Sequence, residues 1–276
     1  MKYLFLGFVT IILFFGCKKE NVRTNMGASS QTENANNSYK LVWSDEFDYT
    51  GLPDSTKWNY ESGHVRNNET QYYEVARLKN SQVKNGHLII TARNDNYHHH
   101  GITSASIITK GKMQFLYGKI VVRAKMPVGN GAWSAIWTAG INRDTVHWPL
   151  CGEIDILEWV GRGPQYILGS MYMPNYNGTT DTSSVTIYNT GDSSLSSKFH
   201  TYALEWDSSQ LKYYYDNYNY ATYKASDLTP EKWLPFTKPH FLLLNLAMGG
   251  ESGGVIDETK FPFTYQVDYV RYYQKK

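Results

Sequence analysis

The stretch Gly152-Glu-Ile-Asp-Ile-Leu-Glu-Trp159 places three carboxylates inside six residues of an otherwise apolar, β-branched segment. A segment of this composition favours a strand, in which alternate side chains share a face. Glu153 and Asp155 then share one face, whereas Glu158 points to the other. One extra residue at 156–157, a β-bulge, returns Glu158 to the acidic face and leaves the apolar side chains for the core. The sequence therefore predicts a bulged strand with one acidic and one buried face.

These carboxylates fit the needs of a retaining glycosidase, which uses an ionised carboxylate as nucleophile and a protonated carboxyl as acid, about 5 to 5.5 Å apart. The Cα atoms of Glu153 and Glu158 are expected roughly 13 Å apart, at about 3.3 Å for each of four effective steps, so their side chains must lean together. Asp155 lies between them and can help to set the distribution of protons. A calcium site or a solvated edge strand is the alternative, although an exposed strand would not carry Ile, Ile, Leu and Trp on its other face.

Short strands are also expected along the rest of the chain. The runs that favour strands are 40–43, 87–92, 119–126, 154–159, 202–206, 211–215, 241–246 and 267–273. Turn-forming pairs such as Asn85-Gly86 and Asp216-Asn217 lie beside them, and no long stretch has helical periodicity. This pattern predicts an all-β protein with one antiparallel sandwich or barrel as its single folded domain.

The composition narrows the possible functions. The 276 residues carry 27 basic and 25 acidic side chains, so the dense basic stripe of a simple nucleic-acid binder is absent from the sequence. Tyrosine, at 23 residues, and tryptophan, at 8, are abundant, which favours a β-rich protein with aromatic-lined surfaces. We expect no nucleic-acid partner.

The first 16 residues resemble a bacterial lipoprotein signal peptide. Lys2 precedes an apolar run over 3–15 that is short for a permanent bilayer span, and a small residue then precedes Cys17. In this pattern the signal peptide 1–16 is removed and Cys17 is lipidated. The polar segment 17–38 is then a lipidated, flexible tether, since it has too little apolar surface to fold.

This interpretation leaves 39–276 as the folded domain and places the protein in the bacterial cell envelope, attached to a membrane through its N-terminal lipid alone. Plain secretion and a retained anchor are the alternatives. We expect a monomer.

Other motifs surround the acidic strand in a fixed order. They are Trp43-Ser-Asp-Glu-Phe47, Trp58-Asn-Tyr60, Asn67-Asn-Glu-Thr-Gln-Tyr-Tyr73, Tyr117-Gly118, Arg123-Ala-Lys-Met-Pro127, Gly131-Ala-Trp-Ser-Ala-Ile-Trp137, Phe199-His-Thr-Tyr202, Glu205-Trp206, Leu244-Asn-Leu-Ala-Met-Gly-Gly250 and Val267-Asp-Tyr-Val-Arg271. Together with the bulged Glu-x-Asp-x-x-Glu strand, they resemble glycoside hydrolase family 16 over nearly all of 40–274, in the form typical of laminarinases.

The resemblance implies a β-jelly roll sandwich of the concanavalin A-like type, with a concave substrate cleft. It also implies hydrolysis of internal β-linkages of a polysaccharide with retention of configuration. On the matching positions, Glu153 would be the nucleophile, Asp155 its assisting carboxylate and Glu158 the general acid and base. No cofactor is expected for catalysis.

Further residues are candidates for substrate binding. Flat indole faces stack on pyranose rings, so Trp133, Trp137 and Trp148 could line the cleft, with core packing as the alternative. The resemblance implies that Asn67 and Glu69 contact sugar hydroxyls, although both could instead cap a turn.

Two further sites are suggested by position. His147, which precedes Trp148, is a candidate for substrate contact, with a structural hydrogen bond as the alternative. Asp268, with the backbone near Glu46 and Gly86, resembles the place where many family members hold a structural calcium ion on the convex side.

Three segments depart from the laminarinase pattern. Laminarinases usually have an Arg in the segment 103–106, a His in 169–172 and a Trp-Pro pair near 251–254, and this chain has none of them there. In the family these residues belong to the substrate cleft, so the reaction type is retained while the sugar is open. Endo-β-1,3-glucanase activity is the leading hypothesis. An endo-β-1,4-galactosidase acting on poly-N-acetyllactosamine or mucin-type glycans is the second, and a non-catalytic glycan-binding lipoprotein the third.

Overall fold

The computed structural model describes residues 20–24, 38–175 and 181–276. The predicted signal peptide 1–16 and Cys17 lie outside these ranges. Within the predicted tether, Glu20–Thr24 forms strand β1, which pairs in parallel with strand β13 (Asp181–Asn189). The expectation of a tether without secondary structure therefore differs from the structure at these residues. The cause is that the edge of a sheet offers unpaired backbone groups to any extended segment.

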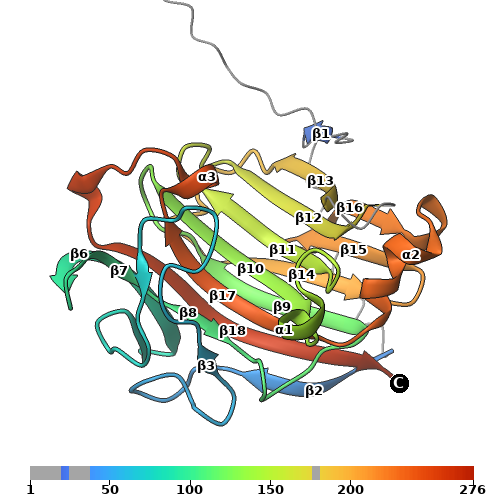
Figure 1. Cartoon of the computed structure of the whole chain (residues 1–276), viewed down its shortest axis with the longest axis horizontal. Coiled ribbons are helices and arrows are strands. Elements are labelled where there is room, and N and C mark those ends of the chain that lie inside the picture. Colours follow the sequence, from blue (N-terminus) through green and yellow to red (C-terminus); the bar gives the residue numbers. More distant parts are fainter. Residues whose placement is uncertain (1–19, 25–37, 176–180) are drawn as a thin grey trace, which may run out of the picture.

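Two largely antiparallel sheets form the body of the protein, and each has one parallel pair of strands at an edge, β1 with β13 and β4 with β7 (Figure 1). In order across the first sheet, the strands are β1, β13, β12 (Tyr166–Pro174), β11 (Glu153–Val160), β10 (Ala132–Gly140), β17 (His240–Met248), β8 (Ser106–Ile108) and β3 (Asn59–Tyr60). Across the second sheet, they are β16 (Tyr218–Lys224), β15 (Gln210–Tyr215), β14 (His200–Trp206), β9 (Gly118–Lys125), β18 (Phe263–Lys275), β6 (His87–Tyr97), β7 (His100–Ser104) and β4 (Tyr72–Tyr73). Strand β2 (Tyr39–Asp45) pairs with β18, and β5 (Ser81–Lys84) pairs with β6.

Helices are short throughout the described residues. They are α1 (Arg143–Val146), α2 (Pro230–Trp233), α3 (Gly250–Gly253) and the 3₁₀ turns Ala225–Asp227, Leu234–Thr237 and Glu258–Lys260. None of these helices has the length and apolar character needed to cross a membrane. The prediction of a β-jelly roll sandwich without long helices is confirmed.

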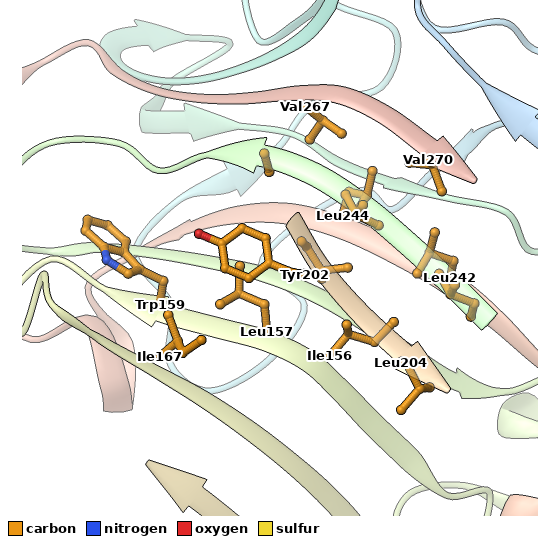
Figure 2. Packing of buried hydrophobic residues seen from close by; sticks show 14 of the residues in the cluster. Ile156, Leu157, Trp159, Ile167, Tyr202, Leu204, Leu242, Leu244, Val267 and Val270 are labelled. Carbon is orange, nitrogen blue, oxygen red and sulfur yellow. The ribbon is translucent and has the colours of Figure 1, made fainter. Parts of the chain in front are cut away.

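The core lies between the two sheets and contains the apolar face of β11. Ile156, Leu157 and Trp159 are 0 to 1% exposed. Figure 2 shows them together with Tyr202 and Leu204 of β14, and with residues of β17 and β18, in one packed cluster. Burial of this apolar area is the main source of stability for the sandwich. It also fixes which face of β11 is turned away from the core.

The register of β11 contains the predicted bulge. Asp155 is opposite Ser170 of β12, and Glu158 is opposite Leu168, so three steps along β11 match two along β12. The same irregularity appears against β10, where the register shifts between Ile136 and Trp137. The extra residue lies at 156–157, and the bulge prediction is confirmed.

Candidate active site

The bulge brings the three predicted carboxylates together. Glu153, Asp155 and Glu158 line one cleft of about 600 Å³ on the outer face of the first sheet. Asp155 is 3% exposed and accepts a hydrogen bond from Ser170 Oγ at 2.5 Å. Because the alternate side chains of β11 are held in the core, the acidic face cannot turn away from the cleft.

Burial and mutual repulsion change the protonation of these carboxyls. Burial, followed by the nearby charge of Glu158, raises the pKa of Glu153 from 4.5 to about 7. Burial and the charges of both glutamates also raise the pKa of Asp155 well above its usual range. A cluster of this kind retains a proton at neutral pH, as an enzyme needs when one carboxyl must be an acid and another a nucleophile.

A tryptophan holds the third carboxylate of the cluster. Trp133 of β10 donates a hydrogen bond from Nε1 to Oε1 of Glu158 at 3.1 Å, and it is 9% exposed. This hydrogen bond orients the carboxyl of Glu158 within the cleft. Trp133 therefore lines the cleft as predicted, although most of its ring is covered by protein.

The other two predicted tryptophans also line the cleft, in different ways. Trp148 is 42% exposed and lies near Tyr172, with 5.9 Å between ring centres, so it offers a free face to a sugar ring. Trp137 is 4% exposed and donates from Nε1 to Asn245 at 2.8 Å. The guanidinium of Arg66 lies 4.8 Å from its ring centre. Trp137 therefore supports other side chains more than it offers an open stacking surface.

The predicted loop residues Asn67 and Glu69 lie at the rim of the cleft. Glu69 is 6% exposed and accepts hydrogen bonds from Gln71, Tyr73 and Asn67. Burial raises the pKa of Glu69. The loop is packed against Gly250, whose φ of 65° and close approach to Asn67 exclude a side chain there.

His147, the candidate for substrate contact that precedes Trp148, lies at the C-terminal end of α1. It is exposed, and it does not line the cleft as the described residues define it. The residue follows α1 with a φ of 63°, so the chain turns sharply at this point before Trp148 enters the cleft wall.

Several residues that line the cleft were not predicted. They are Arg66, Ala135, Arg143, Leu168, Tyr172, Val185, Ile187, Asn245, Glu251 and Ser252. In the segment 103–106, Ser106 donates from Oγ to Glu61, the ion-pair partner of Arg66, at 2.6 Å. Tyr172 lies directly opposite Glu153 in the register of β11 and β12. Of the lining residues, Leu168, Tyr172, Glu251 and Ser252 fall in or beside the segments that depart from the laminarinase pattern.

The residues predicted for calcium are engaged with cations of the protein itself. Asp268 accepts a hydrogen bond from Arg123 and lies 3.3 Å from Nδ1 of His87, which follows Gly86. Glu46 forms an ion pair with Arg271 at 2.8 Å. Throughout the described ranges, no group of three or more His, Cys, Asp or Glu side chains is arranged to hold a metal ion. Calcium binding at Asp268 and the backbone near Glu46 and Gly86 stays a prediction.

A bulged acidic strand in a cleft on a jelly-roll sheet is the arrangement of a glycoside hydrolase that acts on polysaccharides, and comparison with known proteins agrees. The chain belongs to glycosyl hydrolases family 16, whose model matches residues 55–271. It is 40% identical to a β-glucanase of Rhodothermus marinus over 250 residues, which is 86% of this chain and 85% of that protein.

Two other similarities bear on the substrate. The laminarinase structure from Rhodothermus marinus matches with a TM-score of 0.78 and 37% identity, covering 86% of this chain and 98% of that one. A keratan-sulfate endo-1,4-β-galactosidase of Sphingobacterium multivorum is 33% identical, in a match that covers 96% of this chain and 65% of that protein.

Proposed function

We propose that the protein is a retaining, endo-acting β-glycanase that cleaves internal linkages of a β-1,3-glucan. The observation that carries the proposal is the set of three carboxylates on the bulged strand β11, brought together in one open cleft. The similarity to a β-glucanase and to a laminarinase supports β-1,3-glucan as the substrate.

In the proposed reaction, Glu153 attacks the anomeric carbon while Glu158 gives its proton to the leaving glycosidic oxygen. A covalent glycosyl-enzyme forms and the leaving half of the chain departs. Glu158 then takes a proton from water, which attacks the same carbon and releases Glu153. The two displacements together retain the configuration.

Asp155 does not attack the sugar in this scheme. Burial and the charges of the two glutamates raise the pKa of Asp155, which favours its neutral form, and the neutral form adds no negative charge next to the nucleophile. Ser170 fixes the orientation of its carboxyl. Asp155 is therefore a positioning residue, and its neutral state helps Glu153 to stay ionised.

The test is a product profile. We expect residues 39–276 to release short oligosaccharides from laminarin, and Glu153→Gln to release none. Products from keratan or another poly-N-acetyllactosamine glycan, with none from laminarin, would overturn the glucanase proposal.

A second candidate is an endo-β-1,4-galactosidase. It is favoured by the cleft residue Tyr172 and by Ser106, which donates to Glu61, the ion-pair partner of Arg66. Both stand in segments where laminarinases usually carry His and Arg. The Sphingobacterium relative also favours it. Release from keratan alone would establish it. Binding to glycans without any product would instead support the third hypothesis, a non-catalytic glycan-binding protein.

We also propose that Cys17 carries a lipid and holds the enzyme in the bacterial cell envelope. The supporting observation is the signal pattern that ends at Cys17. Metabolic labelling with a radioactive fatty acid in a bacterial host should label the full chain but not Cys17→Ser. Equal labelling of both would contradict this assignment.

A further inference from the structure

One cation in the cleft has no part in the proposed chemistry. Arg66 lies between β3 and β4, and its side chain is 14% exposed. Its Nη2 donates to Oε2 of Glu61, and the same oxygen accepts a hydrogen bond from Ser106 of β8 at 2.6 Å. Glu61 is also tied to β8 through its backbone, with a 3.0 Å bond from its N to the carbonyl of Ser106. The guanidinium is therefore anchored to the first sheet.

Two aromatic rings fix the guanidinium further. Its Cζ lies 4.8 Å from the ring centre of Trp137 and 6.0 Å from that of Tyr73. Both rings are themselves held, since Trp137 donates to Asn245 and Tyr73 donates to Glu69. An arginine fork held by an ion pair and by ring contacts presents its remaining donors in a fixed direction.

The remaining donors have no protein acceptor. Among the described residues, Nε and Nη1 of Arg66 are buried without a hydrogen-bond partner. Buried donors of a charged group are almost always paired, because leaving them unpaired costs free energy. Arg66 lines the cleft, so a bound molecule is the missing acceptor that the site can receive.

The charge around Arg66 indicates the kind of acceptor. Glu61 neutralises the guanidinium directly, and Glu69 adds a second negative charge nearby. An anionic substituent would be repelled by these two carboxylates, whereas a hydroxyl or ring oxygen of a neutral sugar would not. Arg66 lies against Trp137, which is opposite Asp155 in the register of β10 and β11, whereas Ala135 is opposite Glu158. Arg66 therefore lies towards the nucleophile end of the cleft. At the other end, Glu158 is bonded to Trp133.

We propose that Arg66 is a specificity-determining residue that donates hydrogen bonds from Nε and Nη1 to oxygens of a neutral sugar unit bound at the nucleophile end of the cleft. The proposal rests on the proposed function only in taking a polysaccharide as the ligand of the cleft. It predicts that the Nε and Nη1 donors of the planar guanidinium, and not its positive charge alone, determine which glycan binds.

Arg66→Lys separates these two roles, because lysine keeps the charge that pairs with Glu61 but lacks the fork. We expect a melting temperature close to that of the parent and a kcat/KM that is about 10- to 100-fold lower on the cleaved glycan, mainly through KM. Arg123→Lys is the matched control, since Arg123 also pairs with a carboxylate and lies 5.1 Å from the ring of Phe199. It lies on β9 of the other sheet, and kcat/KM should not change.

Binding provides a readout that does not need turnover. In a Glu153→Gln background, calorimetric titration with laminarihexaose and with a poly-N-acetyllactosamine hexasaccharide should show about 10- to 100-fold weaker binding when Arg66→Lys is added. Unchanged KM and unchanged affinity in the Lys variant would overturn the proposal even if the parent cleaves glycan. If the parent cleaves nothing but Glu153→Gln binds glycan through Arg66, the proposed function fails and this inference stands. Absence of binding to both probes would overturn it.

Discussion

Two buried aspartates of this protein have opposite surroundings. Asp45, at the end of β2, is 1% exposed and accepts hydrogen bonds from four groups. The donors are the backbone of Phe47 at 3.3 Å, Tyr49 at 3.2 Å, Lys57 at 3.4 Å and Trp58 at 2.8 Å. This carboxylate is paired with donors and with a cation.

Asp155 is also buried, but fewer hydrogen-bond donors contact its carboxyl than contact that of Asp45. The hydrogen bond found for its carboxyl within the described residues comes from Ser170, and its charged neighbours are Glu153 and Glu158. The comparison shows that the fold can supply hydrogen-bond donors and a cation to a buried carboxylate that has a structural role. In the cleft, three acids lie close together. Burial and the repulsion between them raise the pKa values of Glu153 and Asp155, and this arrangement does not stabilise the fold.

The largest effect is expected for Glu153→Gln, which changes the acidic cluster of the cleft and leaves the surroundings of Asp45 intact. Removing the nucleophile should lower kcat by at least about 10³-fold on any glycan that the parent cleaves, because glutamine cannot form the glycosyl-enzyme. The measurement is the initial rate of reducing-end release, with circular dichroism as the control for folding. A variant with normal turnover would show that Glu153 is not the nucleophile.

Glu158→Gln should have the next largest effect. Loss of the acid is expected to lower kcat on polysaccharide by about 10²- to 10⁴-fold. An aryl glycoside with a good leaving group needs less protonation and should be affected less, and azide should accelerate the second step. The measurement compares both substrates with and without azide. Equal losses on both, with no effect of azide, would remove Glu158 from the role of acid.

Asp45→Ala tests the structural side of the comparison. Its removal leaves the indole N–H of Trp58 without its acceptor and removes the ion pair of Lys57, whose ammonium keeps its hydrogen bond to the carbonyl of Ser44. We therefore expect a loss of about 2 to 4 kcal/mol in the free energy of unfolding. Urea denaturation measures this loss. At a temperature where the variant stays folded, kcat should be that of the parent. A change below about 0.5 kcal/mol would mean that these hydrogen bonds contribute little net stability.

The smallest effect concerns the stability cost of the acidic cluster. Since the folded protein raises the pKa of Glu153 from 4.5 to about 7, its protonation favours folding fully below pH 4.5, and this contribution is lost as the pH rises through about 7. Glutamine has no charge to bury. Glu153→Gln should therefore be more stable than the parent by about 1 to 3 kcal/mol at pH 8 and by little at pH 4.5. A gain that does not depend on pH would contradict this account of the cluster.

All eight predicted runs lie in or largely overlap strands. Some of these strands alternate between buried and half-buried residues, as β9 does, and others are buried throughout, as β17 is. Strand β10 is also buried throughout, but it was missed because its many Ala, Ser, Thr and Gly residues give it neither the alternation of β9 nor the run of large apolar residues that marks β17. Strand β12 contains Gly169, which is needed because a side chain there would meet Tyr220 at 2.4 Å, and glycine weakens a strand prediction.

The candidate active site shows a similar limit, because contacts between distant segments cannot be predicted from spacing within one strand. The acidic face of β11 and its bulge could be predicted because both depend on spacing within one strand. Arg66 could not, since its role comes from Trp137, which lies on β10 and is far from it in the sequence. His147, a candidate for substrate contact, is exposed and is not among the described residues that line the cleft, because the turn after α1 sets its position.

The most direct test of the central claim is the configuration of the first product. Proton NMR of the glycan that the parent cleaves, recorded in the first minutes before mutarotation, distinguishes the anomers at the new reducing end. Two displacements at Glu153, with Glu158 as acid and base, predict that the β-anomer appears first. Initial release of the α-anomer would show inversion and contradict the assignment of Glu153 as a nucleophile.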